Sequence, residues 1–219
     1  MKILRIDSSA RTNRSITRDL ADTFIHEVQT LHGKADVIVR DVGRAPPPFI
    51  DEEWIAACFT PDAERSPAQQ RKLSLSDTLI SEVSAAQIIL IAVPMYNYGM
   101  PAALKAWVDQ VVRVNKTFSF DLSRGDWPLE PILSGKQLLV VSSRGEFGFE
   151  PGGVRVEMNS LDPHIAACAR YLGVSDIKTV AVEYQEFGDD RHAASIKSAK
   201  AELAAIAQEI CPSQLPEIV

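Results

Sequence analysis

Four short runs of aliphatic residues, separated by longer amphipathic stretches, constrain the fold of this chain more than any other feature. They are KILRID, DVIVRD, QIILIAVP and KQLLVVSS, at residues 2–7, 36–41, 87–94 and 136–143; a weaker run, IKTVAV, lies at 177–182. Near-continuous apolar strands are typical of parallel sheets, because helices cover both faces of such sheets. We therefore expect the four strong runs to be buried strands.

Helical patterns separate these runs. After the first one, apolar residues recur at intervals of three and four, which predicts one apolar helix face formed by Ile16, Leu20, Phe24, Val28 and Leu31. Further helices are predicted over residues 67–83, 101–112, 159–173 and 190–210, the last two ended by Gly173 and Pro212. Five strand–helix repeats predict an α/β fold with helices on both faces of a doubly wound, five-stranded parallel sheet. The flavodoxin-like strand order is favoured, in a single domain over residues 1–219.

Two segments fall outside this repeat. Residues 44–66 are rich in proline and acidic residues, and residues 115–135 are predicted to form an irregular excursion or a hairpin. Long insertions in a compact domain are usually functional or disordered. Their aromatic residues favour a lid or a subunit contact over disorder; these are Trp54, Phe59, Phe118, Phe120 and Trp127.

Composition and charge exclude several classes of protein. Lys and Arg number 23 against 29 Asp and Glu, a net charge of −6, which disfavours a nucleic-acid partner. No apolar run is long enough to span a membrane, and the beginning of the chain does not resemble a signal peptide. Three widely spaced cysteines, Cys58, Cys168 and Cys211, indicate neither a metal site nor a disulfide framework. We expect a soluble, cytoplasmic protein.

The predicted topology locates a ligand site beyond the carboxyl ends of the strands. The first loop there, DSSARTNRSIT at residues 7–17, directly precedes a helix and is rich in hydroxyl groups, from Ser8, Ser9, Thr12, Ser15 and Thr17. Together with Arg11 and Arg14, these groups favour a bound phosphate at the helix N-terminus. The alternative is an ordinary helix cap, which needs only one such side chain. No glycine-rich dinucleotide or P-loop pattern is present, so a terminal monophosphate is the better match.

Two further loops open at the same edge. The third run is followed by MYNYGMP at residues 95–101, where backbone amides and two tyrosine rings could contact a planar heteroaromatic ring. The fourth is followed by SRGEFGF at residues 143–149, where Phe147 and Phe149 could cover a flat substrate. A phosphate pocket beside an aromatic cleft describes a site for flavin mononucleotide (FMN), which would itself carry the redox chemistry.

The stretch VPMYNYGMPAALKAWVDQV, with the DSS loop, the S-x-T sequence, the T-F-x-F segment and the S-R-G turn, resembles the FMN-dependent NADH-azoreductase and NAD(P)H:quinone oxidoreductase family. The resemblance implies a flavodoxin-like homodimer. It implies that the phosphate is held by Ser9, Ser15, Ile16 and Thr17, and that the ribityl chain and ring contact Met95, Tyr96, Asn97 and Tyr98. Ser143, Arg144, Gly145 and Glu146 would close the site around the ring, and Phe120 would line the substrate site.

The implied activity is a two-electron ping-pong reaction. NADH or NADPH reduces the flavin and leaves, and a quinone or an aromatic azo compound is then reduced. No side-chain nucleophile and no metal is implied. Glu146 departs from the glycine common in the family, and a carboxylate there would disfavour an anionic reduced flavin. The alternatives are a non-catalytic, flavodoxin-type FMN electron carrier and a flavin-free regulatory protein with the same fold.

Overall fold

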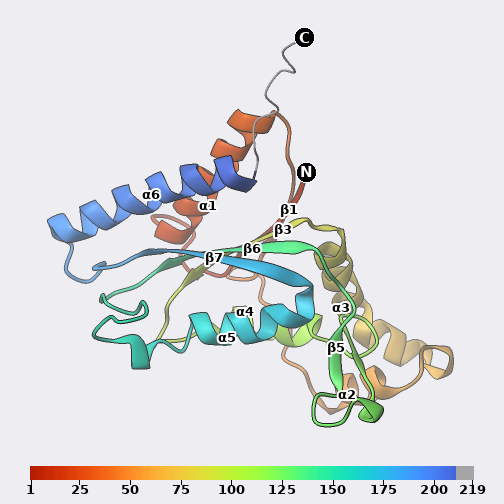
Figure 1. Cartoon of the computed structure of the whole chain (residues 1–219). Helices are drawn as coiled ribbons and strands as arrows, with labels where there is room; N and C mark the ends of the chain where they lie inside the picture. Colours follow the sequence, from red (N-terminus) through yellow and green to blue (C-terminus); the bar gives the residue numbers. More distant parts are fainter. Residues whose placement is uncertain (211–219) are drawn as a thin grey trace.

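The computed structural model describes residues 1–210, and Cys211 and the helix stop predicted at Pro212 lie outside them. A five-stranded parallel sheet forms the centre of the molecule, in the order β2-β1-β3-β6-β7 (Figure 1). The strands are β1 (Lys2–Asp7), β2 (Asp36–Asp41), β3 (Ile88–Pro94), β6 (Lys136–Ser143) and β7 (Val174–Val182). This is the flavodoxin-like order, so the predicted fold class is confirmed.

Helices cover both faces of this sheet. On one face lie α1 (Ile16–His32) and α6 (Asp190–Ile210); on the other lie α3 (Pro67–Ala85), α4 (Ala102–Val111) and α5 (Asp162–Ala169) (Figure 1). Strand residues alternate between the two cores: Ile3 packs with Leu20 and Phe24 of α1, whereas Leu4 packs with helices of the opposite face. Period-two alternation of buried residues is what two covered faces require.

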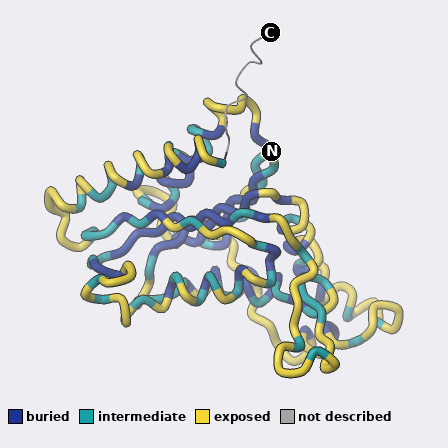
Figure 2. Tube along the Cα trace, viewed as in Figure 1, coloured by how far each residue is buried: buried dark blue, intermediate teal, exposed yellow. Residues whose placement is uncertain are grey.

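One expectation about burial was wrong. The centre of the sheet is buried (Figure 2), and β3 is buried over its whole length. β2, however, is only partly covered, and Val39 is 55% exposed. β2 lies at the edge of the sheet, where a strand has one neighbour and where the covering helices leave part of each face open. The apolar run at residues 36–41 therefore predicted more burial than β2 has.

Two predicted boundaries also shift. β7 begins at Val174 rather than at residue 177, because its first residues pair with the start of β6. The helix predicted over residues 159–173 is α5 followed by the short 3₁₀ turn η4 (Arg170–Leu172). Gly173 ends that turn in the left-handed region, with φ of 79°, as a helix C-terminal glycine commonly does.

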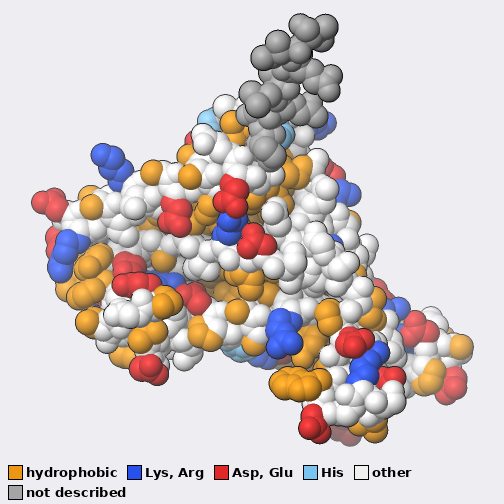
Figure 3. Space-filling view, in the orientation of Figure 1, with side chains coloured by type: hydrophobic (Ala, Val, Ile, Leu, Met, Phe, Trp, Pro, Cys, Tyr) orange, Lys and Arg blue, Asp and Glu red, His pale blue; other side chains and the backbone are white. Residues whose placement is uncertain are grey.

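The two additional segments contain secondary structure of their own. Residues 44–66 include α2 (Glu52–Phe59) and the turn η1 (Asp62–Glu64), and Trp54 packs against α3. Residues 115–135 form a hairpin of β4 (Phe118–Phe120) and β5 (Leu129–Pro131) around the turn η2 (Leu122–Arg124). Hydrophobic side chains are exposed over the corner of the molecule that these segments form (Figure 3).

Candidate functional site

A cleft opens at the carboxyl edge of the sheet, where the loops after four strands meet. One part of it is a cavity of about 240 Å³, lined by residues after β1, β3, β6 and β7. These include Ser9, Ser15 and Ile16, then Met95 and Tyr96, then Ser143 and Gly145. The structure thus brings together residues of all three loops that the sequence singled out. Since the carboxyl ends of parallel strands share one edge, this is where a ligand is expected.

The cavity has an anion-binding end at the N-terminus of α1. Ser15 caps this helix, and its Oγ accepts a hydrogen bond from the Arg18 N–H at 3.5 Å. The N–H groups of Ile16 and Thr17 have no acceptor among residues 1–210, so they remain available to a ligand. Within the same part of the chain, the guanidinium groups of Arg11 and Arg14 are not paired with a carboxylate. Unpaired cations at a helix N-terminus are suited to a phosphate.

The hydroxyl groups of this loop divide into two sets. Ser9 and Ser15 line the cavity, whereas Thr17 is buried and its Oγ1 lies 3.3 Å from the Ser15 Oγ. Ser8 does not face the cavity: it is buried, and its Oγ donates to the Ala92 carbonyl at 3.0 Å. Thr17 can therefore orient Ser15, while Ser8 fastens the loop to β3.

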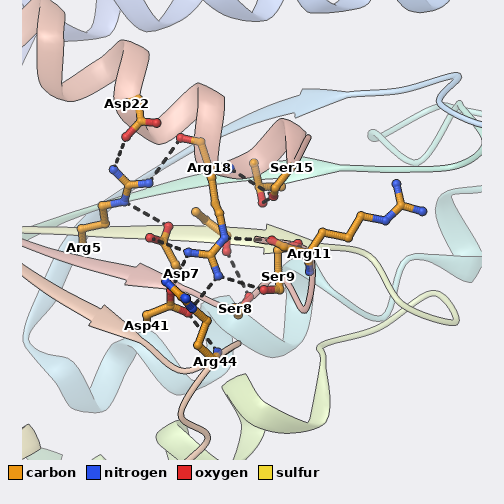
Figure 4. Close-up of polar contacts among 12 residues, drawn as sticks. Arg5, Asp7, Ser8, Ser9, Arg11, Ser15, Arg18, Asp22, Asp41 and Arg44 are labelled. Atoms are coloured by element: carbon orange, nitrogen blue, oxygen red, sulfur yellow. Dashed lines mark hydrogen bonds and ion pairs between the residues drawn. The ribbon is translucent and has the colours of Figure 1, made fainter. Parts of the chain in front are cut away.

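A network of charged side chains lies beside the loop and contacts its backbone through Arg18 (Figure 4). Asp7, at the end of β1, is 2% exposed and accepts from Arg5 and Arg18. Arg18 also donates to both carboxylate oxygens of Asp41, at 2.7 and 2.8 Å. Burial raises the pKa of Asp7, and this outweighs the two arginines that act to lower it. Burial also acts to raise the pKa of Asp41, but hydrogen bonds from Arg18 and from the Arg44 N–H lower it below its usual range.

The loop after β3 is a tight turn that displays its two tyrosines. The N–H groups of Tyr96 and Gly99 donate to each other's carbonyl groups, at 3.1 and 3.0 Å. Asn97 and Tyr98 have φ of 47° and 65°, so both central residues of the turn are in the left-handed region, as in a type I′ turn. A tyrosine is uncommon in that conformation, and such residues cluster at functional sites.

Each tyrosine connects this turn to a different neighbouring loop. The Tyr96 hydroxyl accepts from the Ala10 N–H at 3.4 Å, on the β1 side. The Tyr98 hydroxyl donates to Glu146 at 3.1 Å, on the β6 side, and this bond raises the pKa of Tyr98. Glu146 also pairs with Arg155 at 3.0 Å. Arg155 therefore partly compensates the negative charge of Glu146, which is predicted to lie beside the flavin ring.

A second cavity, of about 360 Å³, adjoins the first. It is lined by Met95, Asn97, Tyr98, Gly145, Glu146, Phe149 and Glu186, and three of these residues also line the first cavity. The site is therefore elongated, with a cationic end and an end flanked by rings and loop backbone. Both parts together fall within the roughly 300–1,000 Å³ that is typical of small-molecule sites.

Arg144 occupies the predicted loop, but its side chain points inward. The guanidinium is 3% exposed, donates to Asp162 at 2.6 Å and lies 3.5 Å from Glu183. It also lies over the ring of Phe149, 5.6 Å from the centroid. The backbone N–H of Arg144 donates to the Val182 carbonyl, its own carbonyl accepts from Gln185, and neither cavity includes Arg144, so the structure does not support the predicted contact between Arg144 and a ring. Of the two phenylalanines, Phe149 lines the second cavity, whereas Phe147 stacks on Tyr184 with centroids 4.6 Å apart.

Phe120 lies at the opposite edge of the sheet from the cleft. α4 leads from the loop after β3 to the amino edge of the sheet, and the β4–β5 hairpin follows it (Figure 1). There Phe118 packs against Tyr171, just before β7 begins, with centroids 5.3 Å apart. Neither cavity of the cleft includes Phe120, which is 53% exposed. Within one copy of the chain, Phe120 does not line the site.

The sequence interpretation omitted three residues that line the first cavity: Pro94, Gln185 and Glu186. Gln185 and Glu186 follow β7, whose weak apolar pattern gave little reason to inspect its loop. The Glu186 side chain crosses Gly145 so closely that a Cβ at Gly145 would lie 2.8 Å from its Oε1. The topology was the available signal, because every strand of a parallel sheet ends at this edge.

Within residues 1–210, no three His, Cys, Asp or Glu side chains converge so that they could hold a metal ion. None of the helices in that range is long and apolar enough to cross a bilayer.

The residues present fit FMN. Its phosphate would meet free helix N–H groups, Ser9, Ser15 and the two unpaired arginines, and its ring would lie between the turn at Tyr96–Gly99 and the loop after β6. These features define a mononucleotide-binding protein of the flavodoxin-like class.

Comparisons with known proteins narrow this class. Residues 1–207 match a family model described as flavodoxin-like fold. The chain is 53% identical to FMN-dependent NADH:quinone oxidoreductase 2 of Idiomarina loihiensis over 95% of this chain and 90% of the relative. It is 40% identical to FMN-dependent NAD(P)H:quinone oxidoreductase 1 of Pseudomonas aeruginosa, over 94% and 98%. A Bacillus anthracis FMN-dependent NADH-azoreductase, solved with FMN, superposes with a TM-score of 0.83 at 17% identity, over 96% and 99%. The chain belongs to the flavodoxin-like family and, within it, to the FMN-dependent NADH:quinone oxidoreductases.

Proposed function

We propose that this protein is an FMN-dependent NAD(P)H:quinone oxidoreductase that reduces quinones by two electrons in a ping-pong reaction. The proposal includes reductive cleavage of aromatic azo compounds to amines, since the structural neighbour described above is an azoreductase. The observation that carries it is the elongated cleft, with a cationic helix N-terminus at one end and a ring-lined opening at the other.

FMN, when bound, supplies the hydride and electron transfer, and the chain's own residues bind and orient it. Ser9, Ser15 and the N–H groups of Ile16 and Thr17 would hold the phosphate, with Arg11 and Arg14 as counter-ions. Met95 lines both cavities and would contact the part of the cofactor between its phosphate and its ring. The hydrogen bonds of Tyr96 and Tyr98 to the two neighbouring loops fix the width of the cleft before a ligand enters. Preorganisation of this kind lowers the entropy cost of binding.

A homodimer is part of the proposal. The hairpin and α2 expose Phe120, Trp127 and Phe59, which are 53%, 78% and 74% exposed. In Figure 3 hydrophobic side chains are interspersed with charged ones at this corner, and exposed large apolar side chains are typical of an interaction surface. Because Phe120 lies far from the cleft of its own chain, it can line a substrate site only if a second copy brings its hairpin to this cleft. We place the protein in the cytoplasm.

The test is an anaerobic titration of the FMN-loaded protein. NADH or NADPH should bleach the flavin absorbance rapidly, and benzoquinone or an azo dye should then restore it. A bound flavin that neither nicotinamide cofactor reduces would instead support the electron carrier. A folded chain that binds no FMN would contradict both functions. Sedimentation of the same sample tests the dimer.

A further inference from the structure

We propose that Arg18 is the positioning residue of the phosphate site, although it does not itself contact the phosphate. The inference rests on the proposed function, since it concerns how this chain selects FMN over riboflavin, the flavin without a phosphate. Arg18 lies two residues beyond the helix start, next to the hydroxyl-rich loop, so by sequence alone it would count as a third phosphate-binding arginine. The hydrogen bonds of Arg18 indicate that it supports the loop instead of binding the phosphate.

Every nitrogen of the Arg18 guanidinium is occupied by protein acceptors. Nε donates to the Arg11 carbonyl at 3.0 Å, and Nη2 donates to the Ser9 carbonyl at 2.9 Å. Both terminal nitrogens also donate to Asp41, and Nη1 reaches Asp7 at 3.2 Å (Figure 4). The side chain is 14% exposed; it does not line the 240 Å³ cavity, but it lines a neighbouring cavity of about 440 Å³ that shares Arg14, Ser15 and Ile16 with the first. It has no donor left for a ligand.

The two carbonyl contacts are those that matter for the ligand. Ser9 and Arg11 both line the cavity, and the Arg18 guanidinium donates hydrogen bonds to the backbone carbonyls of both residues. The direction of the Ser9 hydroxyl and of the Arg11 N–H, which donates to the Ser9 Oγ at 3.2 Å, is therefore set by the Arg18 side chain. Asp7 and Asp41 orient the planar guanidinium in turn, because a bidentate carboxylate fixes its plane.

Arg18 also has an electrostatic effect on the site. Asp7 and Asp41 are carboxylates placed beside a loop that must receive a dianion. Arg18 compensates both of them. Without its charge, Asp41 would lose its guanidinium partner and Asp7 would keep only Arg5, so the negative charge near the phosphate would increase, while the riboflavin part of the ligand would be unaffected.

A second contact supports the same loop from the β2 side. The Gly43 N–H donates to the Asp7 carbonyl at 3.0 Å, and a Cβ at Gly43 would lie 2.2 Å from the Ser9 carbonyl oxygen. Real Cβ atoms do not approach oxygen so closely, so any side chain at Gly43 must displace the Ser9 backbone. Gly43→Ala therefore displaces the backbone of the phosphate-binding loop at Ser9 by a steric clash, without changing a charge.

The experiment measures the affinities of FMN and riboflavin for purified apoprotein by fluorescence quenching. Arg18→Gln should weaken FMN binding by about tenfold or more, the equivalent of one lost charge-assisted hydrogen bond, and change riboflavin binding less than about threefold. Arg18→Lys keeps the charge but not the geometry, so an intermediate loss is expected. Gly43→Ala should also reduce the FMN-to-riboflavin preference.

Arg65→Gln is the matched control. Arg65 is 10% exposed on its side chain, donates to the carbonyls of Ala57 and Cys58, and pairs with Asp62, far from the cleft. Its loss should lower stability to a similar degree and leave the ratio of the two affinities unchanged. If Arg18→Gln does not fold, Arg18→Lys and Gly43→Ala carry the test.

The outcomes distinguish the phosphate site itself from the positioning role of Arg18. A wild-type protein that binds both flavins equally would overturn the phosphate site itself, and the proposed function with it. A strong wild-type preference for FMN that folded Arg18 variants retain, or a loss that affects both flavins equally, would overturn only the positioning role of Arg18.

Discussion

Removal of the Arg144 side chain should destabilise the protein rather than remove a ligand contact. In Arg144→Met, Asp162 and Glu183 would lose their shared cation, which is 3% exposed. Removal of one partner from a buried ion pair typically costs about 3–5 kcal/mol, because the remaining charge stays desolvated. The two carboxylates retain 27% and 17% exposure, so water can partly hydrate them and the lower end of that range applies. We expect a loss of about 3 kcal/mol, or roughly 6–12 °C in Tm for a chain of this size.

The measurement is urea unfolding of wild type and variant without FMN, in which the midpoint should fall while the m-value stays constant. Arg191→Met is the control, because Arg191 and Asp189 form an exposed pair, 51% and 42% exposed, at the same edge of the sheet. Loss of that pair and of the contacts between Arg191 and two aromatic rings should cost less than about 1 kcal/mol. If Arg144→Met loses less than about 1 kcal/mol yet binds FMN much more weakly, the guanidinium contacts the ligand and the inward orientation is not the functional one.

Three further predictions concern charge, substrate and cofactor. Because the pKa of Asp41 is lowered in the folded state, its contribution to stability is present above about pH 4 and is lost as the pH falls through that folded-state pKa. Asp41→Asn should therefore flatten the decline of Tm below pH 4, and an unchanged decline would contradict this. If Phe120 lines the partner's cleft, Phe120→Ala should raise KM for quinones in steady-state kinetics without changing the FMN titration curve, and the reverse pattern would count against it. Free FMN at 100 times its Kd should stabilise the fold by about 2.7 kcal/mol in thermal unfolding, and the absence of any shift would argue against binding.

The sequence predicted the sheet well because buried parallel strands leave a strong local signal. Four strong apolar runs, the weaker fifth run and the helical stretches between them favoured the flavodoxin-like strand order that the structure has. The edge strand β2 pairs in parallel with β1, as predicted, and differs from the expectation only in its burial, since Val39 is exposed. Burial on each face depends on how far the helices extend, and this is a property of the packing rather than of the run itself.

The site was harder to predict, because the direction of a loop side chain depends on backbone angles that residue types do not specify. Ser8 and Ser9 are adjacent and chemically identical, yet one donates into the sheet and the other lines the cavity. Arg11, Arg14 and Arg18 divide in the same way, into two unpaired cations and one fully engaged in the scaffold. A count of hydroxyls and cations indicated an anion site but could not say which groups meet the ligand.

The position of Phe120 could have been predicted from topology alone. In a doubly wound sheet each helix leads from the carboxyl edge back to the amino edge, so any excursion between a helix and the next strand lies at the amino edge. The β4–β5 hairpin lies between α4 and β6, and the cleft lies at the carboxyl edge. A residue on that hairpin can therefore serve the reaction only in another copy of the chain. In this topology, a substrate role for Phe120 and a dimeric enzyme are a single hypothesis, and a monomer with full quinone reductase activity would refute both parts together.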